Sequence, residues 1–446
     1  MYDLIILGAG PAGYVAAEHA GRLGRTTLLI EKDLLGGVCL NCGCVPTKSF
    51  LHSAKLYAHA LHSEAFGVAV KEARFDYGKM KARTEKIQDT LRNGVAGMMK
   101  RHKVEVVVGD ATVESAKAVR VGDTVHEGAN LLLASGSSPA HPPIPGLAGN
   151  PYVVDSTGML SAGQLVDHLA VIGGGVIGIE FASFYALAGK KATVLEMLPQ
   201  ICGSTDKELA AILQRKLESM GVSIHVGAKV VRVEGDVVHF EDKNGKTETV
   251  KADMILSATG RKANVDGLGC EKINLDFDKR GIRVNERAET NVPGVYAAGD
   301  VTGRIQLAHF ASRQGIVAVN NMFGHPDICR EDAIPGVIYS DPEIAGVGLT
   351  EAQAKERGIE CKTLKMPLAA SGRFLAETEG GRGVVKAVVG ARGEVLGMHV
   401  VGSYASEMIG AAAIMIEAEL RARDVQDIVF PHPTVSEIMR DVMFMY

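Results

Sequence analysis

The chain has 446 residues, a formal net charge of −4 and 46% hydrophobic residues. This length is sufficient for several domains, each with its own apolar core. Charges of both signs are spread along the chain, a pattern that predicts no nucleic-acid partner and no anionic membrane surface and leaves a small molecule as the expected ligand. The sequence shows no basic leader and no run of about 18 apolar residues, so we expect a cytoplasmic protein without a membrane span.

The first predicted element is a strand, glycine turn and helix over residues 3–31. An apolar run leads into Gly8, Gly10 and Gly13 in GxGxxG spacing, and a second apolar run ends at Glu31. In a dinucleotide fingerprint the first glycine permits the turn, the second lets the backbone approach a pyrophosphate, and the third allows close helix packing. Because the terminal acid accepts hydrogen bonds from a ribose, this segment predicts a dinucleotide site.

The next segment carries three of the seven cysteines, Cys39, Cys42 and Cys44. A helical pattern begins at about Val45 after a glycine loop, which puts Cys44 at a helix N-terminus, where the macrodipole stabilises a thiolate. Lys48 follows on the same helical face and adds a nearby positive charge. The spacing also fits a zinc or iron–sulfur loop, but no convincing fourth ligand is evident. We therefore favour a redox cysteine site and expect no metal.

Residues 168–196 repeat residues 3–31 without a gap. Gly173, Gly175, Gly178 and Glu196 fall at the positions of the first three glycines and the first acid. Chance does not explain two copies in register, so we predict two dinucleotides. A flavin and a nicotinamide are the usual pair for moving electrons through a cysteine couple, which places FAD at the first site and NAD at the second. Glu196 would repel a 2′-phosphate, which favours NAD over NADP.

After each copy, an apolar run ends in a turn of small residues, at 130–139 and at 254–264. These runs are predicted to be the strands that complete the two nucleotide-binding sheets. A third run, 295–303, ends in Gly299-Asp300, which places an acid at a strand end. The candidate cofactor-binding residues of these segments are Ser135, Gly136, Gly260 and Asp300, and Ala308, after the third segment, is a further candidate.

From about Ile334, strand patterns alternate with helices and predict a separate α+β domain. The predicted fold class is therefore α/β, with two Rossmann-like dinucleotide-binding domains followed by this α+β domain. The predicted bounds are 1–140 for the FAD-binding domain, 141–262 for the NAD-binding domain, 263–333 for a central segment that completes the FAD site, and 334–446 for the C-terminal domain.

The segment GGVCLNCGCVPTK, residues 36–48, resembles the GGxCxNxGCxPxK signature of the flavin-dependent pyridine nucleotide disulfide oxidoreductases. The resemblance extends over the whole chain, through both fingerprints and the Gly299-Asp300 segment to HPTVSE at 432–437. It implies FAD and NAD as cofactors and a redox disulfide between Cys39 and Cys44. It also implies a homodimer formed through a C-terminal dimerisation domain, with the apolar helix at 408–416 as a candidate interface.

Roles for single residues also follow from the resemblance. It implies that Cys39 exchanges with the substrate and Cys44 contacts the flavin. Glu180 matches the acid that pairs with the lysine beside the flavin, here Lys48. Asp300 matches the acid that binds the ribityl chain.

The resemblance assigns His432 as the acid/base for the substrate thiols, acting from the partner subunit, and Glu437 as the residue that orients it. An imidazole that titrates near neutrality suits thiol deprotonation. The spacing alone leaves a local alternative, because Thr434 and Glu437 are spaced as a helix capping box. Three features depart from the family pattern: Cys42, where an aliphatic residue is usual, Pro431 before the histidine, and a chain somewhat short for the type.

Within the family, residues 307–324, 339–350, 369–377 and 400–413 resemble members that oxidise dihydrolipoyl groups with NAD more than glutathione or mercuric reductases. The implied substrate is a dithiol, either a small molecule or part of a lipoyl domain. The implied partner is a 2-oxoacid dehydrogenase or glycine cleavage complex. Two alternatives stay open: a related NAD(P)H-dependent disulfide or metal reductase, and a flavoprotein electron-carrying subunit whose cysteines are idle.

Overall fold

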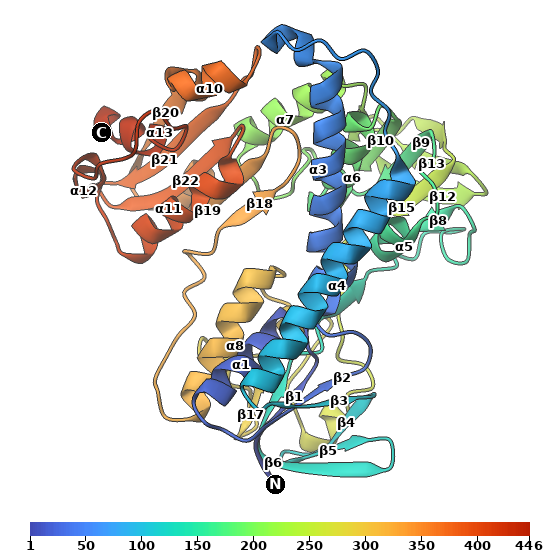
Figure 1. Cartoon of the computed structure of the whole chain (residues 1–446), viewed down its shortest axis with the longest axis vertical. Helices are drawn as coiled ribbons and strands as arrows, with labels where there is room; N and C mark the ends of the chain where they lie inside the picture. Colours follow the sequence, from blue (N-terminus) through green and yellow to red (C-terminus); the bar gives the residue numbers. More distant parts are fainter. The chain divides into compact units, whose positions relative to one another are not determined.

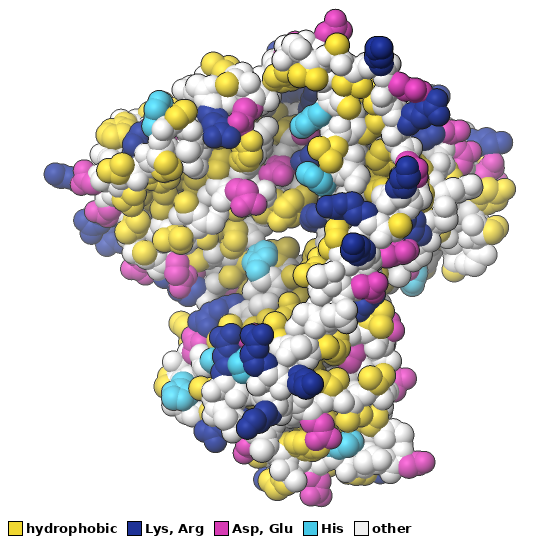
Figure 2. All heavy atoms as spheres, viewed as in Figure 1, with side chains coloured by type: hydrophobic (Ala, Val, Ile, Leu, Met, Phe, Trp, Pro, Cys, Tyr) yellow, Lys and Arg dark blue, Asp and Glu magenta, His cyan; other side chains and the backbone are white.

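A computed structural model describes the whole chain, Met1 to Tyr446, as two compact units, each discontinuous in sequence (Figure 1). The first unit comprises Met1–Ser49, Gly78–Ala140 and Gly260–Arg330, and the second comprises Phe50–Tyr77, His141–Thr259 and Glu331–Tyr446. The division into four functional domains stays a prediction. No helix combines the length and the apolar character that crossing a membrane requires. On the face drawn in Figure 2, side chains of both charges are interspersed among hydrophobic ones.

The first unit contains a seven-stranded sheet in the order β3-β2-β1-β6-β5-β4, with β17 also paired to β6. Strands β3, β2, β1, β6 and β17 are parallel, whereas β4 and β5 extend β6 in antiparallel fashion. The predicted strands in 130–139 and 295–303 are thus confirmed as neighbours in the first nucleotide-binding sheet. The strands are β1 (Tyr2–Leu7), β2 (Thr27–Glu31), β3 (Glu105–Val108), β4 (Ala111–Ser115), β5 (Ala118–Val121), β6 (Thr124–Leu133) and β17 (Val295–Ala297).

Both faces of this sheet are covered. Leu4 and Ile6 of β1 face one apolar core and Ile5 and Leu7 face another, because successive side chains of a strand point to opposite faces. Helices α1 and α8 pack closely on the first face, and a Cβ atom at Gly315 would lie 2.5 Å from the carbonyl oxygen of Ala12. The helices are α1 (Pro11–Arg22), α2 (Gly37–Cys42), α3 (Cys44–Leu61, which continues into the second unit), α4 (Tyr77–Arg101) and α8 (Ala308–Met322).

The second unit contains a five-stranded parallel sheet in the order β11-β10-β9-β15-β8. The predicted strand in 254–264 is confirmed as β15, next to β9. A three-stranded antiparallel sheet, β12-β13-β14, packs against it through an apolar cluster that includes Val238, Phe240 and Ile255. The strands are β8 (Val153–Val154), β9 (His168–Ile172), β10 (Lys191–Glu196), β11 (Ser223–Val226), β12 (Lys229–Glu234), β13 (Val237–Glu241), β14 (Thr247–Lys251) and β15 (Met254–Ser257).

The C-terminal part of the second unit is an antiparallel sheet in the order β18-β19-β22-β21-β20, backed by α11. The predicted change to an α+β arrangement near Ile334 is confirmed. The strands are β18 (Gly336–Ile338), β19 (Ile344–Gly348), β20 (Cys361–Pro367), β21 (Val384–Gly390) and β22 (Val395–Val401). The helices of the unit are α5 (Ser156–Ser161), α6 (Val176–Leu187), α7 (Lys207–Ser219), α9 (Glu351–Glu356), α10 (Gly372–Glu377), α11 (Ala405–Glu417), α12 (Ala422–Gln426) and α13 (Ile438–Asp441).

Helix α6 is buried on nearly all sides, which its apolar sequence anticipates. One side lies on the nucleotide-binding sheet, and the other side contacts the chain next to β18. There the Glu180 carboxylate accepts a hydrogen bond from the Tyr339 N–H at 3.0 Å, and the Ser183 hydroxyl accepts one from the Asp341 N–H at 3.1 Å. The nucleotide-binding and C-terminal parts of the second unit are therefore joined by polar contacts as well as by apolar packing.

Candidate active site

The first glycine turn has the geometry that a pyrophosphate site requires. Gly8 has φ 102°, a left-handed conformation that favours glycine, and a Cβ atom at Gly13 would lie 1.8 Å from the Gly8 carbonyl oxygen. At Gly10, before α1, a Cβ atom would meet only the Cα of Gly37, at 3.9 Å. The helix N-terminus therefore has the open approach that an anionic group needs.

Glu31, at the end of β2, is bound back to this turn. Its Oε2 accepts a hydrogen bond from the Ala9 N–H at 2.7 Å, and its Oε1 accepts one from the Asp33 N–H at 3.0 Å. The carboxylate is thus held at the edge of the glycine turn, where the fingerprint places the ribose. These residues fit an adenine dinucleotide such as FAD.

The redox segment is more helical than the sequence suggests. We expected a glycine loop up to about Val45, but residues from Gly37 to Cys42 form α2, and α3 begins at Cys44. The prediction of a loop was wrong. Gly36, with φ 98°, is the left-handed residue directly before α2, and the chain becomes helical at once after it. Cys39 therefore lies within one helical turn, and Cys44 lies at the first residue of the next helix.

Cys39 and Cys44 are brought together by a hydrogen bond between their side chains. This bond, followed by burial, raises the pKa of the Cys39 thiol far above its ordinary value, and the charge of Lys48 opposes the rise. Cys39 therefore keeps its proton and donates it to the sulfur of Cys44, which is exposed. Cys44 is the first residue of α3, where the helix dipole stabilises a thiolate.

Tyr14, on α1, is a residue that the sequence analysis missed. Burial raises the pKa of its phenol, and electrostatic interactions with the cysteine pair and with Glu18 raise it further. Its hydroxyl group thus belongs to the surroundings of the cysteine pair. No group of three or more His, Cys, Asp or Glu side chains is arranged to hold a metal ion.

The second glycine turn repeats the first within the other unit. Gly173 has φ 106°, and a Cβ atom at Gly178 would lie 2.0 Å from the Gly173 carbonyl oxygen. No heavy atom lies within 4 Å of a Cβ atom built at Gly175. Glu196 accepts hydrogen bonds from the Gly174 N–H at 2.6 Å and from the Leu198 N–H at 2.7 Å. This turn therefore fits a second dinucleotide.

The remaining candidate cofactor residues gather in the first unit. Strands β7 (Ser137–Pro139) and β16 (Arg261–Ala263) pair in antiparallel fashion directly after two glycines of positive φ, Gly136 at 71° and Gly260 at 115°. Ser135 donates a hydrogen bond to the Asn264 carbonyl oxygen at 2.7 Å, and Ala308 is the first residue of α8.

Asp300 begins a short 3₁₀ helix after β17, and its carboxylate accepts a hydrogen bond from the Ser137 hydroxyl. Arg261 donates to the Ser137 hydroxyl at 2.7 Å, and its Nε lies 3.8 Å from Asp300 Oδ2. The cation and the hydroxyl hold an acidic acceptor at the strand end, where a ligand hydroxyl would be bound. Arg261 was missed, although it directly follows the Gly260 turn.

Lys48 and Glu180 belong to different units. Glu180 is buried on α6, where its carboxylate binds the Tyr339 N–H. The predicted ion pair between Lys48 and Glu180 stays a prediction.

His432 and Glu437 form a hydrogen-bonded pair in the second unit. The distance from His432 Nδ1 to Glu437 Oε2 is 2.9 Å, with the imidazole 79% exposed and the carboxylate side chain 9% exposed. The hydrogen bond from His432 lowers the pKa of Glu437 in spite of partial burial, and the Thr434 N–H contributes as well. With Nδ1–H directed to the carboxylate, Nε2 becomes the basic nitrogen of an exposed ring.

The alternative interpretation of Glu437, as part of a helix capping box with Thr434, is also confirmed in part. The Thr434 N–H donates to Glu437 Oε1, and the Glu437 N–H donates to the Thr434 hydroxyl, both at 3.3 Å. The reciprocal bonds of a capping box are thus formed, although α13 itself begins only at Ile438. Glu437 both orders the turn and orients the imidazole. The peptide bond between His432 and Pro433 is cis.

Comparison with known proteins supports one family. Residues 2–315 match the model of the pyridine nucleotide-disulphide oxidoreductases, and residues 334–443 match the dimerisation domain of the same group. A dihydrolipoyl dehydrogenase of Geobacillus stearothermophilus is 39% identical over 448 residues, covering 98% of this chain and 94% of that protein. Another, from Bacillus subtilis (strain 168), is 36% identical over 99% of this chain and 97% of its own length.

Among solved structures, the HOCl-induced flavoprotein disulfide reductase RclA from Escherichia coli has a TM-score of 0.88 and 28% identity, and the match covers 100% of each chain. A Cu(II) complex of the same protein has a TM-score of 0.87 and covers 98% of each chain. The matched models span almost the whole sequence, including the cysteine segment and both glycine turns. The chain therefore belongs to the pyridine nucleotide-disulphide oxidoreductase family.

Proposed function

We propose that the chain is a dihydrolipoyl dehydrogenase, with FAD at the first glycine turn and NAD at the second. The hydrogen-bonded Cys39–Cys44 pair is the observation that carries this proposal, since it brings two cysteine side chains together in the unit that has the first nucleotide site. The full-length similarity to dihydrolipoyl dehydrogenases supports the substrate class. When bound, FAD would accept the electron pair of the cysteines and pass it to NAD as hydride.

The chemistry of the cysteines is thiol–disulfide exchange. In the oxidised enzyme Cys39 and Cys44 share a disulfide, and a substrate thiolate attacks the sulfur of Cys39 and releases Cys44 as thiolate. The second substrate thiol then displaces Cys39 from the mixed disulfide, so that the lipoyl disulfide closes and the enzyme gains two electrons. The protonated Cys39 thiol and the Cys44 thiolate are the product of these steps.

His432 is the proposed base for the substrate thiols, with Glu437 as its positioning residue. An exposed imidazole whose Nδ1 is held by a carboxylate suits transfer of protons at Nε2. We propose that it serves the cysteine pair of the partner subunit in a homodimer. Exposed apolar side chains of the dimerisation domain support this assembly, among them Ile414 at 67% and Val429 at 90% exposure.

The nucleotide preference follows from Glu196. One of its oxygens binds the Gly174 N–H of the glycine turn and the other binds the Leu198 N–H, so the carboxylate is fixed where the ribose is expected. A free 2′-hydroxyl donates to such an acceptor, whereas a 2′-phosphate is repelled. NAD is therefore the proposed partner of the second site, and a 2-oxoacid dehydrogenase or glycine cleavage complex is the proposed source of the dithiol.

The direct test is anaerobic turnover of dihydrolipoamide with NAD by the purified yellow protein, followed by NADH absorbance. We expect steady turnover with NAD and much less with NADP. A protein that binds FAD and NAD but does not oxidise dihydrolipoamide contradicts the proposal.

A second candidate is reduction of a metal ion or another disulfide with NADH. The similarity to RclA, of which a Cu(II) complex is known, favours it, although the identity to that protein is 28% and lower than to the dihydrolipoyl dehydrogenases. A matched assay with NADH and Cu(II) distinguishes the two. Faster NADH oxidation with Cu(II) than with lipoamide would favour the second candidate.

A further inference from the structure

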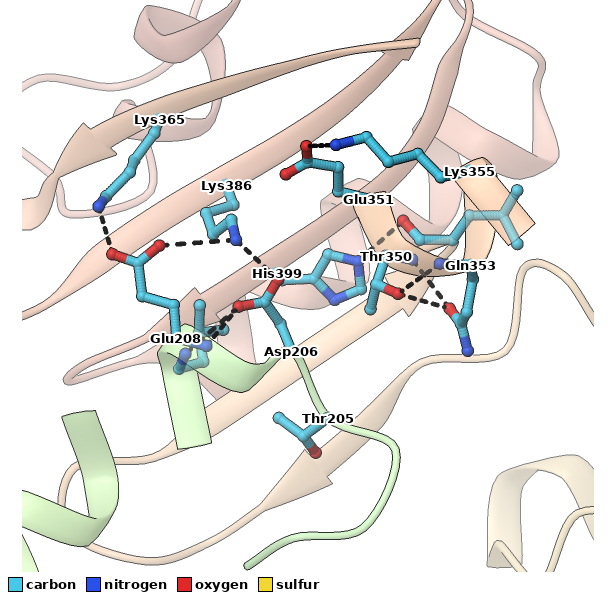
Figure 3. Close-up of polar contacts among 12 residues, drawn as sticks. Thr205, Asp206, Glu208, Thr350, Glu351, Gln353, Lys355, Lys365, Lys386 and His399 are labelled. Atoms are coloured by element: carbon cyan, nitrogen blue, oxygen red, sulfur yellow. Dashed lines mark hydrogen bonds and ion pairs between the residues drawn. The ribbon is translucent and has the colours of Figure 1, made fainter. Parts of the chain in front are cut away.

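A set of four charges, two of them buried, joins the nucleotide-binding part of the second unit to its C-terminal sheet (Figure 3). Lys386, on β21, is 8% exposed and binds the Asp206 carboxylate at 2.7 Å, with Asp206 itself 9% exposed. Glu208 lies 3.6 Å from the same ammonium group and also pairs with Lys365 of β20. Two acids of one short segment thus meet two lysines of one sheet face.

The lysines are arranged in a way that the sheet alone does not favour. Lys365 and Lys386 are directly opposite each other in the β20–β21 register, and like charges in such positions destabilise a sheet. His399 is opposite Lys386 on the other side, but burial lowers the pKa of its imidazole, so it adds no third positive charge. The acids compensate the lysines, and both lie at the start of α7, where the helix dipole also favours negative charge.

Asp206 does two things at once. It is the N-cap of α7, with its Oδ1 accepting hydrogen bonds from the N–H groups of Glu208 and Leu209 at 3.0 and 3.4 Å, while Oδ2 binds Lys386. The sheet lysine therefore fixes the position of the residue at which α7 begins. Helix α7 also packs on β19 and β22 of the same sheet.

The segment that ends at Asp206 follows β10, the strand whose last residue, Glu196, binds the second glycine turn. We refer to Met197–Thr205 as the nucleotide loop. It starts directly after Glu196, and the Cys202 N–H donates to the Gly174 carbonyl oxygen at 2.8 Å. Cys202 is buried with φ 65°, a conformation that is strained for a residue with a side chain and persists only where its surroundings hold it. The loop is thus held at the glycine turn on one side and at Asp206 on the other.

We propose that Lys386 is a positioning residue for dinucleotide binding: through Asp206 it holds the nucleotide loop against the second glycine turn, so that the C-terminal sheet helps to form the NAD site. This inference rests on the proposal that residues 168–196 bind NAD. The exposed apolar side chains of Met197 and Leu198, next to the ribose-binding acid, suit contact with the flat face of an adenine. The pair between Lys386 and Asp206 acts through this loop and touches no reacting atom.

The test compares Lys386→Met with Lys386→Arg in the FAD-loaded protein, with Lys355→Met as matched control. Lys355 pairs with Glu351 on an exposed helix of the same domain. We expect Lys386→Met to weaken NAD binding, measured by calorimetric titration, about tenfold. Lys386→Arg and Lys355→Met should bind NAD as the unchanged protein does. FAD content and the rate at which dihydrolipoamide reduces the bound flavin, a step without NAD, should be unchanged in all three.

A variant that lacks both charges keeps the test informative if Lys386→Met does not fold. Asp206→Asn combined with Lys386→Met removes the ion pair and keeps a side chain that caps α7. We expect this variant to fold and still to bind NAD more weakly. NAD affinity equal to that of the unchanged protein in folded Lys386→Met or in the folded double variant, or equal losses of FAD and NAD, would overturn the proposal. NAD binding is measured without a dithiol. The result can therefore be interpreted even if the protein does not oxidise dihydrolipoamide.

Discussion

The two glycine turns use nearly the same geometry but lead into different segments of the chain. Their acids bind the equivalent N–H groups of Ala9 and Gly174 at 2.7 and 2.6 Å. Beyond the acid of the first turn, the Gly36 N–H binds the Ala9 carbonyl oxygen at 2.9 Å, and the chain enters the cysteine helices. Beyond the acid of the second, the chain passes through the nucleotide loop to Asp206 and α7. The two glycine turns thus share one geometry, and they differ in the segment that follows the acid.

The largest expected effect is on dihydrolipoamide oxidation and follows from a change in the cysteine segment after Glu31. Cys44→Ser should lower dihydrolipoamide oxidation by at least about a thousandfold, because the thiolate that receives the electron pair is lost. Bound FAD and NAD affinity should be unchanged, since neither glycine turn is altered. Cys42→Val is the matched control and should keep most of the activity.

Mass spectrometry of the oxidised enzyme sharpens this prediction. A bridge between Cys39 and Cys44 is expected, and the long-wavelength absorbance that a thiolate produces beside a flavin should be missing in Cys44→Ser. A dominant bridge between Cys39 and Cys42 would reverse the assignment.

The next largest effect should also be confined to the reaction with the dithiol substrate. His432→Gln removes the base that deprotonates the substrate thiols, so dihydrolipoamide oxidation should fall by roughly 10²–10⁴-fold. Transfer from NADH to an artificial electron acceptor requires no thiol and should be retained, and it is the control. Equal loss of both activities would show that His432 supports the fold and does not act on the substrate.

A pair of equivalent changes tests the comparison between the turns directly. Glu196→Arg should weaken NAD binding about tenfold and strengthen NADP binding, because attraction of a 2′-phosphate replaces repulsion. Glu31→Arg should impair FAD retention and leave the ratio of NAD to NADP affinity unchanged. Calorimetry with both nucleotides and flavin absorbance measure the two outcomes, and a change of nucleotide preference in Glu31→Arg would contradict the assignment of the two sites.

The smallest effect concerns stability at the second turn. Burial would raise the pKa of Asp206, but the hydrogen bond and charge of Lys386, with the N–H groups of α7, hold it below its ordinary value. A lowered pKa in the folded state contributes stability above the unfolded value of about 3.9, and this contribution is lost as the pH falls through the folded pKa. Asp206→Asn should therefore lower the thermal midpoint by about 2–6 °C at pH 7 and by less at about pH 2, well below the unfolded pKa. Glu208, Lys386 and His399 face this carboxylate and stay unchanged in the comparison. An equal difference at both pH values would contradict the ion pair.

The parts of the site that follow from local pattern were predictable from the sequence. GxGxxG followed by an acid specifies a strand, turn and helix over one continuous segment, so Gly8, Glu31 and their second copies lie where expected. The position of Cys44 at the start of a helix was equally predictable from the residues that follow it. Helix α2 was missed because a glycine pair before cysteines is typical of loops as well as of helix starts.

Contacts between residues that are far apart in the chain left no comparable pattern in the sequence. Arg261 and Ser137 are 124 residues apart, and Lys386 and Asp206 are 180 residues apart. A lysine in the strand sequence VVKAVVG is normally assigned to an exposed face, and only the packing of α7 shows that this one is buried with a partner. Pairings of this kind become visible only when the sheets and helices are placed in three dimensions.

The pairing of β17 with β6 also affects the order in which the chain can fold during synthesis. Leu131 of β6 lies opposite Val295 of β17, and residues 141–259, made in the interval, belong to the other unit. At about 5–20 residues per second, a ribosome needs on the order of ten seconds to synthesise that interval. Throughout it, β6 has an uncovered edge with free backbone hydrogen-bonding groups, a template for pairing with other chains. The unit whose first strand leaves the ribosome earliest is thus completed only after much of its neighbour has been made.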